Sequence, residues 1–361
     1  MALPALTALE ECSDFSKTVE PFIPQLYALP GELAQVLQKR EGLLDLYVST
    51  NPLISGFAIS LFLGAVFLVA AEANRNYSQV DRLWSLLPTF YIAHFDLWAR
   101  LAGVPSQRMD VALAFSAVWS ARLTYNYARK GGYSIGSEDY RWEIIRGNIP
   151  AWAFHTLNAT FISFMQSVLL FLIAAPVYPV LLAAQFESDV TSADLAFLSM
   201  QLGLVLVEWF ADQQQWDYQA AKKKYQSTAK VPAGCGLTQP ELDRGFVTWG
   251  LWAYSRHPNF AAEQTIWIFL YQWSCFTTKV LYSWAAAGPA FLVLLFQGST
   301  WFTESITAGK YPEYRHYQDK VGMFVPTSPF AYRPLSTLGP KIIRTSEIAK
   351  KQKLQEQKKQ K

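Results

Sequence analysis

The segment 52-PLISGFAISLFLGAVFLVAA-71 decides the class of fold, because its 20 residues include no charged side chain. About 20 consecutive apolar residues carry an α-helix across the hydrocarbon core of a bilayer. Within that core a helix satisfies every backbone N–H and C=O group internally. We therefore expect residues 52–71 to form a transmembrane helix and the rest of the chain to be built around it.

The composition extends this interpretation to the whole chain. Of the 361 residues, 51% are hydrophobic and 15% aromatic, but only 16% are charged, against roughly 25% in soluble domains. The 13 Trp and 18 Tyr residues are typical of aromatic belts at membrane interfaces. The net charge of +3 does not indicate a nucleic-acid partner, and three widely spaced cysteines with four scattered histidines indicate neither a disulfide framework nor a metal site.

Six further segments have the length or apolar character of membrane helices. They are residues 83–102, 109–128, 151–184, which is interrupted by two prolines, 193–211, 259–278 and 281–303. The expected fold is an all-α polytopic membrane bundle of about seven transmembrane helices.

The distribution of basic residues supports seven crossings, because cytoplasmic loops are enriched in Lys and Arg. If the loops alternate between the two sides, one side carries 24 of the 31 Lys and Arg residues and the other carries six. Arg122, inside a predicted span, completes the count. We expect the richer side, with the C-terminus, to be cytosolic.

Three regions are predicted along the chain. Residues 1–51 form an N-terminal extension without a signal-peptide pattern, broken by prolines and carrying an amphipathic interfacial helix over 32–48. Residues 52–330 form the membrane domain, and 331–361 form a basic tail whose composition indicates disorder. Its last four residues, 358-KKQK-361, resemble a dilysine retrieval signal of the endoplasmic reticulum. A generic basic tail would look the same.

The densest polar chemistry lies in 251-LWAYSRHPNFAAEQTIW-267. Pro258 favours a helix start near residue 257, since its fixed φ suits the first turn of a helix. Free N–H groups at such a start, next to Arg256, suit a phosphate group. Asn259 and Glu263 share a helical face four residues apart. A plain helix cap with an interfacial arginine is the alternative.

Two other segments present polar side chains at the expected cytosolic boundary. In 207-VEWFADQQQWDYQAAKKKY-225, Glu208, Asp212 and Gln215 fall on one helical face, where Asp212 suits ribose hydroxyls or an amide. The following lysines suit phosphates or anionic lipid heads. In 303-TESITAGKYPEYRHYQDKVGMFVP-326, the candidate residues are Glu304, Tyr311 and Tyr314, although spaced tyrosines also occur in interfacial belts.

These motifs together resemble one family. YSRHPNF followed by Glu263, ADQQ before it, KYPEYRHYQDKVGMFVP after it, and VDRLWSLLP with RLTYNYARKGGY and EDYRW are similar to the steroid 5-alpha-reductase superfamily. They are most similar to its branch of uncharacterised multi-span proteins classified under a domain of unknown function. The resemblance covers about residues 75–330. It implies a seven-helix bundle that binds NADPH between its C-terminal helices on the cytosolic side.

The resemblance also implies which residues bind the cofactor. The positions that match are Asp212, Arg256, His257, Asn259, Glu263 and Tyr314, to which we add Glu304 and Tyr311 from the C-terminal segment. The substrate half departs from the steroid enzymes, which polarise a carbonyl with a glutamate and a tyrosine; the matching positions are Leu86 and Trp119. Tyr125 and Tyr254 are the candidate replacements that would protonate the product, with Asp81 as a further acid.

The sequence thus favours a membrane oxidoreductase that reduces a conjugated carbon–carbon double bond of a lipid (of sterol, polyprenyl or enoyl type) with NADPH. Its expected partners are a lipid substrate and the membrane, with no nucleic acid and no metal. Two alternatives stay open. An S-adenosylmethionine-dependent methyltransferase of the isoprenylcysteine type shares an RHP motif, and a non-catalytic lipid-binding protein needs no cofactor.

Overall fold

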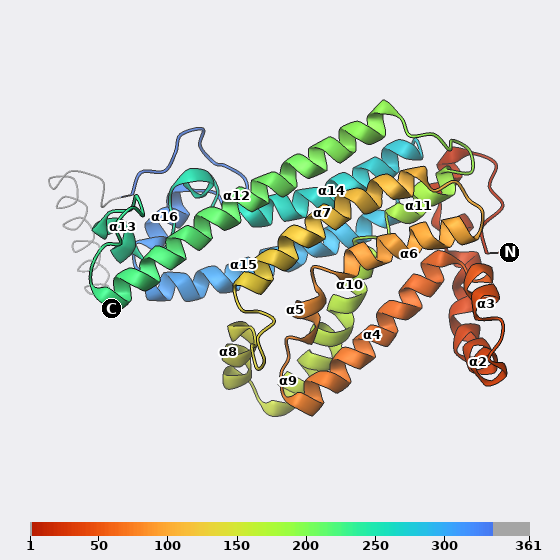
Figure 1. Cartoon of the computed structure of the whole chain (residues 1–361), viewed down its shortest axis with the longest axis horizontal. Coiled ribbons are helices and arrows are strands. Elements are labelled where there is room, and N and C mark those ends of the chain that lie inside the picture. Colours follow the sequence, from red (N-terminus) through yellow and green to blue (C-terminus); the bar gives the residue numbers. More distant parts are fainter. Residues whose placement is uncertain (1, 335–361) are drawn as a thin grey trace, which may run out of the picture. The chain divides into compact units, whose positions relative to one another are not determined.

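The computed structural model describes residues 2–334, and within them all regular structure is helical (Figure 1). The predicted dilysine signal and most of the predicted tail lie outside the described residues. The helices, in chain order, are η1 (Leu9–Ser13), α1 (Phe15–Thr18), η2 (Glu20–Phe22), α2 (Ile23–Lys39), α3 (Leu43–Ser49), α4 (Pro52–Asn74), α5 (Gln79–Leu83), α6 (Leu87–Leu101), α7 (Gln107–Arg129), α8 (Tyr140–Asn148), α9 (Ala151–Leu157), the π-helix η3 (Asn158–Met165), α10 (Gln166–Leu172), α11 (Val177–Ala183), α12 (Ser192–Thr228), α13 (Gln239–Arg244), η4 (Gly250–Ala253), α14 (Pro258–Thr277), η5 (Trp284–Ala286), α15 (Ala287–Lys310) and α16 (Tyr314–Lys320).

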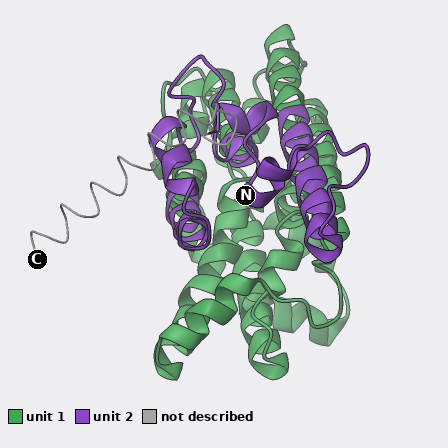
Figure 2. Ribbon diagram, turned by 90° about the vertical axis from the view of Figure 1, so that its left-hand side faces the viewer, with its two compact units in different colours: residues 1–205, 264–295 green, residues 206–263, 296–361 purple. Residues whose placement is uncertain are grey.

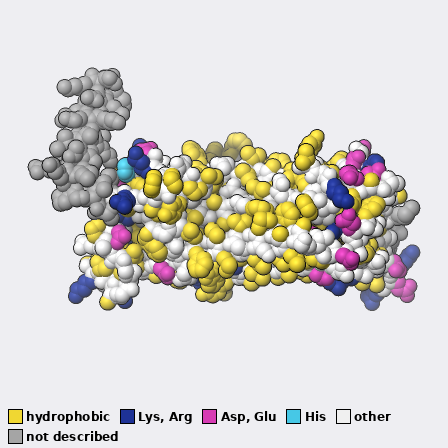
Figure 3. Space-filling model, turned by 90° about the horizontal axis from the view of Figure 1, so that it is seen from above, with side chains coloured by type: hydrophobic (Ala, Val, Ile, Leu, Met, Phe, Trp, Pro, Cys, Tyr) yellow, Lys and Arg dark blue, Asp and Glu magenta, His cyan; other side chains and the backbone are white. Residues whose placement is uncertain are grey.

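Four helical segments are long and apolar enough to cross a membrane: Pro52–Asn74, Ala151–Ala183, Ser192–Thr228 and Trp284–Lys310. They cover four of the seven predicted spans. Large apolar side chains on them face outward, such as Phe62 and Val69 on α4, which are 67% and 69% exposed. Hydrophobic side chains occupy much of the face drawn in Figure 3. This is the pattern expected of a membrane protein.

The other three predicted spans are helical but differ from the prediction in length or polarity. The helix in segment 83–102 is α6, which begins only at Leu87, after the end of α5 at Leu83, and has 15 residues, or about 22 Å at 1.5 Å per residue. That is shorter than the roughly 30 Å hydrocarbon core. Helices α7 and α14 have 23 and 20 residues, but their polar and charged side chains keep them outside the apolar class.

The N-terminal extension differs from its prediction. Instead of one helix over 32–48, α2 begins at Ile23, because Pro24 lies in its first turn, where a proline is tolerated. Pro30 lies inside α2 and does not end it. The predicted helix is divided at Arg40 and Gly42, both of which have positive φ angles, of 57° and 81°. No residue of α2 or α3 is buried.

The chain divides into two compact units. Among the described residues, unit 1 contains 2–205 and 264–295, and unit 2 contains 206–263 and 296–334; Figure 2 colours them green and purple. Helices α12, α14 and α15 contribute residues to both.

Large aromatic side chains and close helix contacts build the core of unit 1. Trp98, Trp119, Trp267 and Trp273 are at most 1% exposed, and the rings of Trp119 and Trp267 meet edge to face with centroids 4.9 Å apart. Gly288 allows the start of α15 to reach the end of α10, because a Cβ there would lie 2.1 Å from the carbonyl oxygen of Leu172.

Unit 2 is organised by side-chain and backbone hydrogen bonds between its separate segments. The indole of Trp252 donates to the carbonyl of Ala211 on α12 at 3.1 Å. Tyr218 on α12 donates to the carbonyl of Glu241 at 2.9 Å. The second half of α12 is therefore tied to α13 and to η4, which overlaps the start of the polar segment 251–267.

Candidate functional site

The predicted helix start is found where the sequence placed it, since α14 begins at Pro258. The two residues before it are held by a strand-like contact. The backbone N–H groups of Arg256 and His257 donate to the carbonyls of Gly322 and Met323, each at 3.0 Å. Ser255 and Gly322 form an isolated parallel bridge. The chain after α16 therefore lies alongside the polar segment and fixes its backbone.

Several side chains around this segment donate hydrogen bonds to a single carboxylate, that of Glu304 on α15. Its Oε1 accepts from Nε of Arg256 at 2.6 Å, from Nε2 of His257 at 3.0 Å and from the phenol of Tyr314 at 3.0 Å. Its Oε2 accepts from Nη2 of Arg256 and from Nε2 of Gln318, both at 2.9 Å. Glu304 is only 3% exposed. Five donors thus surround one buried negative charge, which compensates for the cost of burying it.

Arg256 directs the rest of its guanidinium at the protein as well. Its Nη1 donates to the carbonyl of Gln318 at 3.1 Å and to that of Val321, and the residue is 8% exposed. The predicted phosphate contact of this side chain stays a prediction. The structure pairs Arg256 with Glu304 through two hydrogen bonds, and the sequence did not indicate Gln318 and Val321 as partners because no local pattern marks them.

Two buried tyrosines complete this network, and both are kept protonated. Burial, together with the negative charge of Glu304, raises the pKa of Tyr314 well above its usual value. Burial also raises the pKa of Tyr317, whose phenol donates to the carbonyls of Trp252 and Ser255. Both phenols therefore act as hydrogen-bond donors at neutral pH.

A second polar pair joins α12 to the first turn of α14. The side-chain amide of Asn259 donates through Nδ2 to Oδ1 of Asp212 at 3.0 Å, and Asp212 is 4% exposed. The carbonyl oxygen Oδ1 of Asn259 is buried and has no hydrogen-bond donor among residues 2–334. A buried acceptor without a donor is costly unless a ligand or water supplies one. Glu208 on α12 and Glu263 on α14 are also buried, at 1% and 5% exposure.

Tyr311 is placed by Lys222 rather than by the Glu304 network. The ammonium of Lys222 donates to the phenol oxygen at 2.9 Å and to the carbonyl of Gly245 at 2.7 Å. Burial opposes ionisation of this phenol, but the neighbouring ammonium outweighs it and lowers the pKa of Tyr311. The first lysine of the predicted basic run thus has partners within unit 2, whereas Lys223 and Lys224 are exposed.

The two candidate proton donors are both accessible. Tyr125 lies on α7 in unit 1 and is 52% exposed, with the Arg129 guanidinium carbon 5.4 Å from the centre of its ring. Tyr254 lies in unit 2, two residues before Arg256, and is 41% exposed. Asp81, the further acid among the candidates, is half-buried; desolvation raises its pKa, and the indole of Trp142 donates to it at 3.0 Å.

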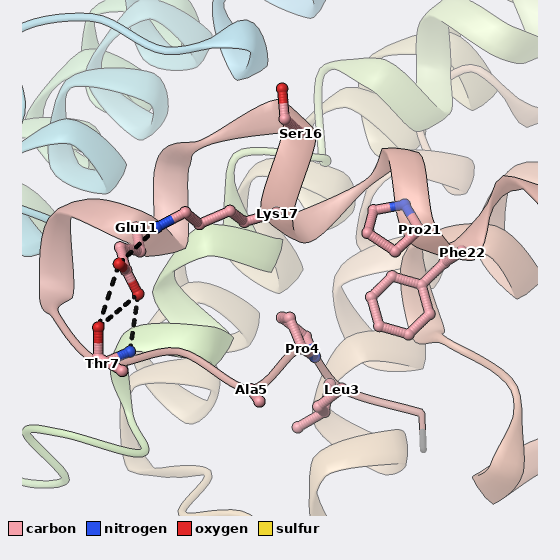
Figure 4. Close-up of a pocket in the computed structure, with 9 residues that line it drawn as sticks. All are labelled: Leu3, Pro4, Ala5, Thr7, Glu11, Ser16, Lys17, Pro21 and Phe22. Atoms are coloured by element: carbon pink, nitrogen blue, oxygen red, sulfur yellow. Dashed lines mark hydrogen bonds and ion pairs between the residues drawn. The ribbon is translucent and has the colours of Figure 1, made fainter.

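Sequence reasoning gave no role to a hollow of about 650 Å³ in the N-terminal extension (Figure 4). Glu11, Lys17 and Thr7 lie at its wall, where Glu11 accepts from the Lys17 ammonium at 2.5 Å and from the Thr7 amide at 2.7 Å. The hydrogen bond from Lys17 lowers the pKa of Glu11 to about 2. This pair is exposed to solvent, and surface ion pairs contribute little to stability.

Comparison with known proteins gives two matches that cover most of the chain. The family described as "Protein of unknown function (DUF1295)" matches residues 66–321. A protein of Schizosaccharomyces pombe (strain 972 / ATCC 24843), named Uncharacterized protein C594.04c, is 37% identical over 324 residues, which is 90% of this chain and 93% of the relative. No solved structure matches. On both sequence matches, this helical chain belongs to the DUF1295 family.

Proposed function

We propose that this chain is an integral membrane oxidoreductase that reduces a conjugated carbon–carbon double bond of a lipid with NADPH. Its motifs resemble those of the steroid 5-alpha-reductase superfamily, and its apolar helices are suited to a substrate taken from the bilayer. The observation that carries the proposal is the Asp212–Asn259 pair at the first turn of α14, with one buried acceptor oxygen that no described residue satisfies.

The residues of unit 2 fit a dinucleotide when they are divided into two groups. Arg256, His257 and Tyr314 hold Glu304 and keep the segment before α14 in place. Asn259 and Asp212 offer a carbonyl and a carboxylate, which suit amide N–H groups and ribose hydroxyls. NADPH would supply the hydride; this part of the chain would bind and orient it and exclude water.

The proposal includes a topology with seven membrane crossings and a cytosolic C-terminus. The four apolar segments supply four crossings, and α6, α7 and α14 supply the others. Their polar side chains then need partners inside the bundle, such as the Asp194 carboxylate that receives the Trp273 indole of α14 at 2.6 Å in unit 1. Localisation in the endoplasmic reticulum is proposed from the C-terminal 358-KKQK-361.

The decisive experiment titrates the purified full-length protein with NADPH and, in parallel, with S-adenosylmethionine. Saturable binding of NADPH alone is the expected result. Binding of S-adenosylmethionine alone would contradict the reductase and support a methyltransferase. Binding of neither ligand would support a non-catalytic lipid-binding protein. Thermal shift reports either ligand, because a ligand at 100 times its Kd stabilises the folded state by about 2.7 kcal/mol.

Variants of Asp212 and Asn259 test whether these two side chains bind NADPH. Asn259→Ala removes one hydrogen-bonding group, worth about 1 kcal/mol or roughly a five-fold loss of NADPH affinity. Asp212→Ala removes a charged acceptor, and we expect a loss of ten-fold or more. Asp217→Ala is the matched control, since Asp217 is an exposed residue of the same helix whose carboxylate accepts from Gln213. Unchanged affinity in both site variants removes the pair from the cofactor site.

A further inference from the structure

A second buried ionic cluster lies in unit 1, whereas the residues proposed to bind the cofactor belong to unit 2. Arg108, in the first turn of α7, is 3% exposed. Its Nε lies 3.2 Å from Oδ2 of Asp194, in the first turn of α12, and its Nη1 donates to the carbonyl of Glu187 at 2.9 Å. In Figure 1 the beginnings of α7 and α12 lie toward the same side as the end of α14.

Both carboxylate oxygens of Asp194 accept hydrogen bonds from the protein, whereas Arg108 does not use all of its N–H donors. The two oxygens of Asp194 accept from the indole of Trp273 at 2.6 Å, from the amide and hydroxyl of Thr191 at 2.7 and 2.8 Å, and from Arg108. Among the described residues, Nη2 of Arg108 forms an ion pair with Oε2 of Glu187 at 3.7 Å, which is too long for a hydrogen bond. One edge of a buried guanidinium thus keeps donor capacity.

These charges line a cavity of about 340 Å³ together with the end of α14. Lys279, also in its wall, lies 3.1 Å from Oε1 of Glu187, and these side chains are 58% and 44% exposed. Thr277 lines the same cavity and is 5% exposed, yet its hydroxyl has no hydrogen-bond partner among the described residues. A buried hydroxyl without a partner indicates that something outside the chain satisfies it.

We propose that this cavity binds a phosphoethanolamine group. Its phosphate would accept from Nη2 of Arg108, from the Lys279 ammonium and from the Thr277 hydroxyl, and its primary ammonium would donate to the carboxylate of Glu187. The pairing follows from the charges, because a simple anion would also meet the carboxylates of Glu187 and Asp194, whereas a zwitterion matches both signs. The volume lies at the lower end of the range for small-molecule pockets.

The surroundings of the cavity fit a lipid as the source of this group. Phe276 and Leu281 line it and are 59% and 90% exposed, and the neighbouring Tyr282 is 82% exposed. Apolar and aromatic side chains beside a polar cavity are typical of a membrane interface. Acyl chains of phosphatidylethanolamine could cover these side chains, whereas a free phosphoethanolamine ester would leave them in water.

Native mass spectrometry of the full-length protein, titrated with phosphatidylethanolamine and with phosphatidylcholine, tests the proposal. The trimethylated ammonium of choline cannot donate a hydrogen bond to Glu187, so we expect phosphatidylethanolamine to bind about ten-fold more tightly, as for a hydrogen bond to a charged group. Glycerophosphoethanolamine, added as competitor, distinguishes the sources: displacement at equal concentration assigns the site to the soluble ester, and failure to displace assigns it to the lipid.

Two variants test the predicted contacts. Thr277→Val preserves shape and removes a hydroxyl that has no protein partner, so folding is retained while phosphatidylethanolamine affinity falls about five-fold. Lys279→Gln is expected to lower it about ten-fold. Lys17→Gln is the control, because Lys17 is also a partly exposed lysine paired with a glutamate, at Glu11. Equal binding of the two lipids, displacement by inorganic phosphate alone, or wild-type affinity in both variants overturns the proposal.

Discussion

The substitution Glu304→Gln tests most directly how the polar segment before α14 is held. Glutamine keeps the size of the side chain but loses the negative charge, while Arg256 stays buried, with its side chain 9% exposed. Glutamine also presents an NH₂ group where Glu304 accepts hydrogen bonds, so at least one of the five donors around the carboxylate meets another donor. Breaking a buried ion pair in this way costs about 3–5 kcal/mol.

The assay is thermal unfolding of the full-length protein in detergent, followed by tryptophan fluorescence at one heating rate. About 3 kcal/mol corresponds to a decrease in Tm of roughly 12 °C or more if unit 2 unfolds on its own, as for a domain of 60–100 residues. Asp319→Asn, an exposed position on α16, is the control and should stay within about 0.5 kcal/mol of the wild type.

A double-mutant cycle separates the ion pair from general damage to the fold. Adding Arg256→Ala to Glu304→Gln removes the stranded positive charge, so the double variant should lose less stability than the sum of the two single variants. If Glu304→Gln melts within 2 °C of the wild type, or if the two effects add fully, the carboxylate does not organise unit 2 and our reasoning fails.

Two further predictions concern pH and backbone conformation. Burial raises the pKa of Tyr314 in the folded protein, whereas tyrosines of the unfolded chain titrate near pH 10, so the unfolded chain loses this proton first as pH rises. The free energy of unfolding should therefore be unaffected below about pH 10 and fall above it. In denaturation measured from pH 8 to 11, Tyr314→Phe should reduce that fall. Gly245 has φ +86°, and a Cβ there would lie 2.0 Å from the Tyr311 ring, so Gly245→Ala should destabilise the protein by about 1–3 kcal/mol. Gly147→Ala, at an exposed position of α8 with nothing within 4 Å, should stabilise it by about 0.5–1 kcal/mol. Equal melting temperatures of the two variants in thermal unfolding would contradict this prediction.

Local patterns predicted the elements that depend on local physics. The charge-free run from Pro52 forms the long helix α4, and Pro258 begins α14 because its ring fixes a helical φ. Each of the seven segments expected to be membrane helices contains a helix, while the seven crossings stay a prediction. For α6 the composition could not decide a crossing, because this helix has 15 residues and begins at Leu87, four residues after the predicted start.

The partners of the polar side chains could not be predicted, because a partner is a matter of three-dimensional distance. An arginine at a helix start looks the same in sequence whether it faces a phosphate or a carboxylate. Glu304 lies 48 residues after Arg256, and nothing in that interval marks the pairing. The same holds for the contact of Gly322 and Met323 with residues 256 and 257, which is made by backbone groups that every sequence possesses.

The five hydrogen bonds to Glu304 also have a consequence for folding during synthesis, because their donors are synthesised both before and after Glu304. Arg256 leaves the ribosome 48 residues before Glu304, and Tyr314 and Gln318 follow 10 and 14 residues later. At about 5–20 residues per second, Glu304 is synthesised roughly 2–10 s after Arg256, which has no access to this carboxylate until then. Burying the arginine without this carboxylate would be costly, so we expect the start of α14 to reach its final packing only after α15 has been synthesised. Nascent chains halted before residue 304 should therefore leave this arginine open to proteases and chaperones.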